Sequence, residues 1–192
     1  MNITHHSTRT SRCLRALALT SVLALGATGC GSDSNGNETT TAAPDAKKAK
    51  QALDSGLKAH SGGDLTAAAA DYQKALTYDP ENKYALYNLA LIDEAGSNYG
   101  LAEQKYRAAL KTDPAYEPAL FNLAILRTAR APKEAIGLYK RAVAADTKDA
   151  AAWLNLGLLL RAAGRAKEGN ADVIRALKLN PKLKDPAKSS GQ

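Results

Sequence analysis

The sequence predicts an all-α protein made of four stacked helical hairpins, and three observations lead to this prediction. Similar residues recur every 33 or 34 positions, apolar residues within each period recur at three- and four-residue spacing, and turn-forming residues separate the apolar segments. The clearest marker is an alanine that returns once in each period, at Ala75, Ala109, Ala142 and Ala176. A fixed period of this length indicates stacked supersecondary units, not a single globular core.

Each period encodes two amphipathic helices. In the second period, residues 84–95 and 100–113 have apolar residues at helical spacing, and residues 96–98 between them favour a turn. Proline follows the second helix in three periods and ends it, because proline cannot continue the helical hydrogen bonds. These prolines are Pro80, Pro114 and Pro181. Neither helix can bury its apolar face alone, so we expect consecutive hairpins to stack.

Small residues return at two further positions of the period, where they let two helices approach closely. In the first helix they are Gly56, Ala90, Ala124 and Gly157, and in the second helix they are Ala68, Ala102, Ala135 and Gly169. A bulkier residue recurs beside them, at Tyr72, Tyr106, Tyr139 and Val173. We expect it to fill the space that the small residues leave.

At these positions the chain resembles the tetratricopeptide repeat family. Residues 150–181 have the family's tryptophan, leucine–glycine pair, alanine and proline, at Trp153, Leu156, Gly157, Ala176 and Pro181. The resemblance covers about residues 49–182 and implies a right-handed α-solenoid in a repeat domain spanning 46–182. Its four units are about 49–82, 83–116, 117–149 and 150–182. The third unit is one residue short and has Thr147 in place of the proline, so we expect its inter-helix turn to differ.

The N-terminus is predicted to be a signal peptide, 1–29, that is removed on export. Arg9, Arg12 and Arg15 precede a short apolar run that ends in small residues before Cys30. The run is shorter than the roughly 20 residues that a transmembrane helix needs. A cysteine after small residues resembles a bacterial lipobox, which implies cleavage before Cys30 and a lipid anchor on it. The alternative is an ordinary signal peptide with a nearby free cysteine.

The two ends of the processed chain are polar. Residues 30–45 are predicted to form a lipid-anchored flexible tether, and residues 183–192 a disordered tail. The anchor implies attachment to the extracytoplasmic face of the cell membrane, or to the outer membrane in a two-membrane cell. No thiol remains in the repeat domain, so it must rest on helix packing alone.

Charge and motifs give little support to catalysis or nucleic-acid binding. The formal charge of +7 falls to +4 without the signal peptide, and no clustered basic stripe with interleaved aromatics is present. The sequence has no metal-ligand cluster, phosphate-binding loop or nucleophile motif, so we expect no enzyme, metal or cofactor. His60 is expected to be solvated or to cap a helix.

The resemblance implies that the first helices line a concave, peptide-binding groove. Asn88, Asn122 and Asn155 recur there, and an amide can both donate to and accept from a peptide backbone. Local helix contacts are the alternative role for these amides, and Asp54 is their equivalent in unit one. The expected apolar and aromatic lining comprises Leu53, Tyr84, Tyr87, Leu91, Phe121, Ile125 and Leu158.

We therefore expect a membrane-anchored, non-catalytic module that captures a protein or peptide segment in this groove, in an envelope complex. The alternative is a homo-oligomeric scaffold assembled through the ends of the array. It follows from the short tail, which would leave Val173 and Leu177 of the last helix uncovered and favour a homodimer or a permanent partner. Recognition of cell-wall glycan by the groove aromatics is a third hypothesis.

Overall fold

The computed structural model describes residues 45–189. The predicted signal peptide, Cys30 and all but the last residue of the predicted tether lie outside this range. The described residues form helices and no strand, which confirms the all-α prediction.

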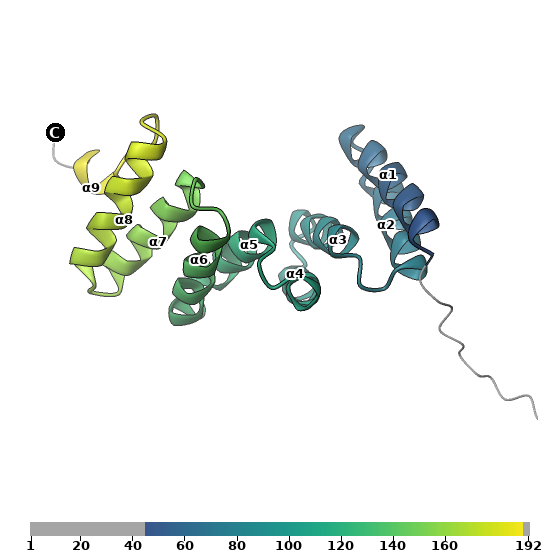
Figure 1. Ribbon diagram of the computed structural model, residues 1–192, viewed down its shortest axis with the longest axis horizontal. Helices are drawn as coiled ribbons and strands as arrows, with labels where there is room; N and C mark the ends of the chain where they lie inside the picture. Colours follow the sequence, from purple (N-terminus) through teal and green to yellow (C-terminus); the bar gives the residue numbers. More distant parts are fainter. Residues whose placement is uncertain (1–44, 190–192) are drawn as a thin grey trace, which may run out of the picture. The chain divides into compact units, whose positions relative to one another are not determined.

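Within this range, eight helices pair into four hairpins, and a short ninth helix follows them (Figure 1). The hairpins are α1 (Ala46–Ser61) with α2 (Leu65–Tyr78), α3 (Lys83–Ala95) with α4 (Tyr99–Thr112), α5 (Glu117–Thr128) with α6 (Pro132–Ala145), and α7 (Ala150–Ala162) with α8 (Ala166–Leu179). The ninth helix is α9 (Pro186–Ser189). The second, third and fourth hairpins begin at the first residue expected for their units.

The hairpins stack in chain order, as the period predicts. The two helices of each hairpin contact each other, and the second helix of one hairpin contacts the first helix of the next, in the pairs α2–α3, α4–α5 and α6–α7. The alanine markers lie inside these contacts and are fully buried. The bulky residues beside them are also buried, with exposed fractions of 0% for Tyr72 and Tyr106, 3% for Tyr139 and 1% for Val173.

Side-chain caps begin four of the helices. An aspartate or asparagine accepts a hydrogen bond from a backbone N–H of the first turn in each case, which satisfies a donor that the helix itself leaves unpaired. These residues are Asp45, Asp64, Asn82 and Asp149, with N···O distances of 2.8–3.1 Å. The short third unit differs at its inter-helix turn, as expected, because α6 begins directly with Pro132.

Part of the predicted tail, residues 183–189, is described by the structure and includes α9. Asp185 is 6% exposed, and its carboxylate accepts hydrogen bonds from Arg161 of α7 at 2.7 and 3.0 Å. Asp185 also accepts a hydrogen bond from the backbone N–H of Ala187 at the start of α9. This bidentate ion pair attaches the segment to α7.

The expectation that Val173 is uncovered is wrong. Val173 packs against Gly157 of α7, where the missing glycine side chain makes room for it, and Leu177 is half-buried. The large apolar side chains that α8 exposes are Ile174 and Leu179, at 63% and 41%. None of the helices within 45–189 combines the length and the apolar character needed to cross a bilayer.

Gly157→Ala should destabilise the protein by about 2 kcal/mol, because overpacking forces helices apart. A Cβ on Gly157 would lie 2.7 Å from the carbonyl oxygen of Gly169 and 2.8 Å from Cγ2 of Val173. The matched control is Gly137→Ala in the exposed middle of α6, where a Cβ meets no atom within 4 Å. That change should stabilise by about 0.5–1 kcal/mol through helix propensity. Urea unfolding followed by circular dichroism measures the free energy of unfolding of both variants. Equal changes in this free energy for Gly157→Ala and Gly137→Ala would contradict the close-packing account.

Candidate functional site

The predicted groove residues lie on the first helices of the hairpins, with different exposure. Tyr84 and Ile125 are exposed at 48% and 43%. The other predicted residues of α3, α5 and α7 are half-buried, and these are Tyr87, Asn88, Leu91, Phe121, Asn122, Asn155 and Leu158. Several of them pack against the core with one side of the ring or chain, namely Tyr87, Leu91 and Phe121. The face therefore offers partly exposed apolar surface on a rigid support.

A first hollow on this face, which we call the α5 hollow, has a volume of about 360 Å³. Its lining comprises Glu94, Tyr99, Glu103, Ile125, Leu126, Ala129 and Arg130. It lies where the end of α3, the start of α4 and the end of α5 meet. Its apolar part comes from the end of α5 and from Tyr99, and its charged residues are Glu94 of α3, Glu103 of α4 and Arg130 in the turn after α5.

A second hollow, the α7 hollow, has a volume of about 320 Å³. Its lining comprises Thr128, Tyr139, Asn155, Leu158, Leu159 and Ala162. Leu158, Leu159 and Ala162 occupy the same positions in the period as three residues of the α5 hollow. Those three are Ile125, Leu126 and Ala129. The two hollows are thus repeats of one site, and both contain predicted groove residues, Ile125 in the first and Asn155 and Leu158 in the second.

The three asparagines interact with other residues of the protein. Asn88 donates from Nδ2 to the backbone oxygen of Tyr84 at 2.8 Å, which is the local helix contact left open as an alternative. Asn122 donates from Nδ2 to the hydroxyls of Tyr87 and Tyr106, at 3.2 and 3.4 Å. Asn155 and Tyr139 line the α7 hollow together, and the amide of Asn155 acts to lower the pKa of Tyr139, against the larger effect of burial. The amides of Asn122 and Asn155 therefore interact with the preceding hairpin.

A cluster of tyrosines lies beside Asn122, between the second and third hairpins. The Tyr116 ring is edge-on to Tyr84 and Tyr87, with centroids 5.7 and 5.4 Å apart, and Tyr87 is 5.8 Å from Tyr106. The Lys83 ammonium lies 5.0 and 5.1 Å from the centroids of Tyr84 and Tyr116, in cation–π range. The sequence reasoning missed Tyr116, because the equivalent loop positions carry Asn82 and Asp149 and no pattern marks it.

Burial and a neighbouring carboxylate change the pKa of Tyr106, the buried tyrosine of this cluster. Tyr106 is fully buried and donates its hydroxyl to Oε2 of Glu94 at 2.8 Å. Burial, and then the hydrogen bond to Glu94, raise the pKa of Tyr106 well above its ordinary value. The hydroxyl therefore stays protonated and acts as a fixed donor to Glu94, a residue of the α5 hollow.

An ion-pair network adjoins the α5 hollow and includes Glu103 of its lining. Glu103 of α4 pairs with Arg107 and with Arg127 of α5, at 2.9 and 3.0 Å. Glu134 of α6 pairs with the same two arginines, at 2.7 and 2.8 Å. Single surface pairs contribute little, but four charges that share partners across three helices restrain the geometry of the hollow.

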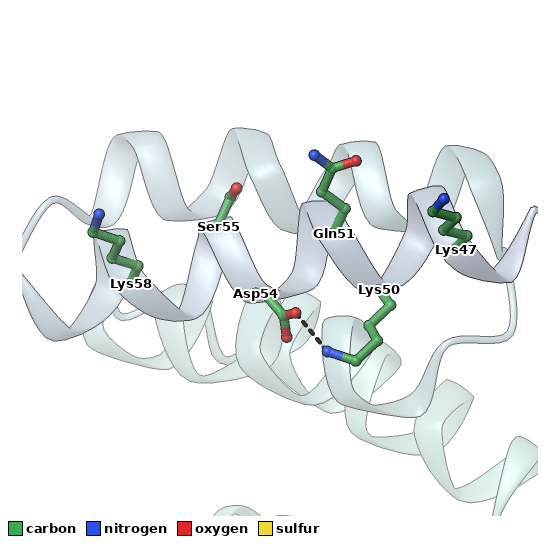
Figure 2. Close-up of a pocket in the computed structure, with 6 residues that line it drawn as sticks. All are labelled: Lys47, Lys50, Gln51, Asp54, Ser55 and Lys58. Carbon is green, nitrogen blue, oxygen red and sulfur yellow. Dashed lines mark hydrogen bonds and ion pairs between the residues drawn. The ribbon is translucent and has the colours of Figure 1, made fainter.

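Asp54 lies in neither hollow. It is exposed on α1 and pairs with Lys50 at 2.5 Å (Figure 2). By helical spacing, it lies opposite the buried residues Ala52 and Gly56. Asp54 therefore interacts within its own helix, and its expected role in the groove stays a prediction. His60 contacts Tyr72, with Nδ1 and Oη 3.3 Å apart. Within residues 45–189 no three His, Cys, Asp or Glu residues are placed to hold a metal ion.

Glu117, at the first position of α5, interacts with Asp149, the cap of α7. Its Oε1 is buried and has no hydrogen-bond partner within the described part of the chain. Burial, followed by the contact with Asp149 and the charge of Asp146, raises the pKa of Glu117 to about 7. Glu117 and Asp149 thus place a pH-sensitive contact between the third and fourth hairpins.

Comparisons with known proteins agree with this architecture. The sequence pattern described as tetratricopeptide repeat matches residues 53–117 and 125–182. No curated protein sequence matches the chain at a significant level. These two results rest on sequence alone.

Solved structures show a similar fold. A MamA structure from Desulfovibrio magneticus RS-1 has a TM-score of 0.62 at 20% identity, covering 71% of this chain and 77% of that one. The first tetratricopeptide repeat domain of Spaghetti (RPAP3), bound to the HSP90 peptide SRMEEVD, has a TM-score of 0.58 at 23% identity and covers 63% and 97%. A structure of pilF from Pseudomonas aeruginosa has a TM-score of 0.61 at 23% identity and covers 71% and 63%.

Glu117→Gln should change how stability depends on pH. The folded protein holds this proton up to a pKa of about 7, whereas an unfolded glutamate releases it near 4.3. The free energy of unfolding contributed by Glu117 therefore falls as pH rises between these values. Solvent screens part of this effect, so the full pKa shift overstates it. The free energy of unfolding of Glu117→Gln should therefore exceed that of the wild type by about 1 kcal/mol at pH 8 and equal it near pH 4.

Urea titrations at several pH values measure this difference. The control is Glu81→Gln, at an exposed loop position between α2 and α3. A pH-independent difference for Glu117→Gln would exclude the coupling to Asp149.

Proposed function

Because the chain belongs to the tetratricopeptide repeat family, we propose that it is a membrane-anchored interaction module that captures a peptide or protein segment on the first-helix face. The α5 and α7 hollows carry this proposal. Each presents two large aliphatic side chains on a rigid helix, and together they offer two equivalent pockets to one bound segment. A partner with two apolar side chains at matching spacing would fill both.

The two pockets differ in charge, which gives the site a direction. Glu94, Glu103 and Arg130 border the α5 hollow, whereas the lining of the α7 hollow contains no charged residue. A segment with a polar or charged group beside its first apolar side chain, and no charged group beside the second, fits this arrangement. The structure of the Spaghetti domain with a bound HSP90 peptide supports the same kind of role, since its fold is similar.

We further propose that a lipid on Cys30 anchors the module to the extracytoplasmic side of the membrane, where it serves an envelope complex. The support is the basic and apolar N-terminal segment followed by small residues and Cys30. Two or more acyl chains hold a protein stably at a bilayer. A polar stretch then separates Cys30 from α1, so captured segments would be brought close to the membrane surface.

The homo-oligomeric scaffold has less support than capture of a partner. Stacking through the array ends needs apolar end faces, but the face of α1 opposite its buried side consists of lysines and other polar residues. Ile174 and Leu179 on α8 offer some apolar surface at the other end. A glycan ligand has no specific observation in its favour.

Ile125→Glu should abolish capture of the partner, because it replaces an apolar contact of the α5 hollow with a carboxylate in addition to Glu94 and Glu103. The matched control is Ile174→Glu, which makes the same change at an exposed position of α8. In-cell crosslinking, purification of this protein and mass spectrometry identify the partner attached to it. We expect a defined partner with the wild type and with Ile174→Glu, and none with Ile125→Glu. Equal recovery with both variants would exclude the hollow as the binding site.

Cys30→Ser should release the protein from the membrane fraction, because serine cannot form the thioether to diacylglycerol. Intact-mass measurement should show acyl mass on the wild type and none on the variant. Cys13→Ser, within the predicted signal peptide, is the control and should leave both readouts unchanged. An unmodified wild-type Cys30 would refute the anchor.

A further inference from the structure

The outer face of α1 departs from the repeat pattern at three positions. In the later hairpins these positions carry alanine, leucine, and isoleucine or leucine, and they face the preceding hairpin. They are Ala85, Leu89 and Ile92 in α3, Ala119, Leu123 and Leu126 in α5, and Ala152, Leu156 and Leu159 in α7. In α1 the same positions carry Gln51, Ser55 and Lys58, all exposed. This face is therefore built for a polar environment and not for another hairpin.

The face is also basic. Lys47, Lys50 and Lys58 lie on it with Gln51, Asp54 and Ser55, and Figure 2 shows the six side chains along α1. They follow one another at three- and four-residue spacing, opposite the buried Ala52 and Gly56. We call these six residues the basic face. None of the six side chains is apolar, and the large apolar side chain that α1 exposes is Leu57, at 44%. The basic face itself therefore lacks the apolar anchors that are enriched in the cores of protein interfaces.

Its charges are only partly neutralised. Lys50 pairs with Asp54, although its side chain remains 74% exposed. Lys47 and Lys58 have no carboxylate within 4.0 Å among the residues that the structure describes. A hollow beside the basic face is lined by Lys48 of α1 and by Lys74 and Asp71 of α2. Lys48 pairs with Asp45, and Asp71 is half-buried. The excess of ammonium groups over carboxylates makes this end of the array complementary to an anionic surface.

We propose that the basic face docks on the anionic headgroups of the bilayer and so orients the repeat array. The inference rests on the lipid anchor of the proposed function. About 15 residues separate Cys30 from Ala46, and a chain of that length reaches at most about 50 Å. Such an anchor confines α1 to the neighbourhood of the headgroups. There, each lysine strengthens attachment about fivefold and the attraction is sensitive to salt.

Docking through α1 leaves the capture site free. The α5 and α7 hollows are formed by residues 94–162 of the later hairpins and share no residue with the basic face. One end of the array would then hold the membrane while later first helices hold a partner. The two activities can be removed separately by mutation.

The test uses the unacylated chain 31–192, which contains all buried apolar residues of the described core, 49–176. Co-flotation is measured with vesicles of phosphatidylcholine alone and of an equimolar mixture with phosphatidylglycerol. The variant is Lys47→Gln, Lys50→Gln, Lys58→Gln. The control is Lys111→Gln, Lys133→Gln, Lys167→Gln, which removes the same charge from exposed positions of α4, α6 and α8. Glutamine matches lysine in helix propensity, so both proteins should fold.

We expect the wild type to bind only the anionic vesicles, and to dissociate at high ionic strength. The basic-face variant should bind about a hundredfold more weakly, and the control close to wild type. No binding by the wild type, or equal weakening of both variants, would overturn the inference. The acyl mass on Cys30 is a separate readout, measured on the full-length protein isolated from cells. Acylation of the full-length protein without vesicle binding by the chain 31–192 refutes only the role of the basic face. Vesicle binding by 31–192 without acylation of the full-length protein refutes only the anchor.

Discussion

The close approach of the two helices in each hairpin is the constraint on which the rest of the structure depends. A Cβ on Gly56 would lie 2.6 Å from Cε1 of Tyr72, and one on Gly169 would overlap the carbonyl oxygen of Gly157. In the middle hairpins, the alanines at the same positions are fully buried. Larger side chains there would force the helices apart, because close-packed helices have no spare volume. The small residues therefore set the spacing of every hairpin, and through stacking they place every first helix.

Repetition of this packing produces a repeated site, but the junctions around it are individual. The second and third hairpins are joined by the tyrosine cluster, by Asn122 and by the network of Glu103, Arg107, Arg127 and Glu134. The third and fourth hairpins meet at Glu117 and Asp149, where burial and the neighbouring carboxylate disfavour the charge of Glu117. The common backbone gives two hollows of similar size, and these local groups give each hollow a different polarity.

The positions of Ile125 and Leu158 could be predicted because the period alone places them on the same face of successive first helices. The roles of the asparagines could not, because an amide at that position can turn to its own helix or to the next hairpin. Asn88 takes the first course and Asn122 the second, with the hydroxyls of Tyr87 and Tyr106 as its partners. Tyr116 was missed for a related reason, since it lies in a loop where the period repeats no residue type.

The sequence by itself determined that the chain is helical, that its hairpins stack, and which residues are buried between them. Such properties depend on short-range spacing and on side-chain size, which repeat along the chain. Only the tertiary structure decided that Asp185 attaches to Arg161, that Val173 is covered, and that Gln51, Ser55 and Lys58 form an exposed face. Each of these depends on what lies opposite a residue in space. At the ends of an array that neighbour differs from the one the repeat supplies.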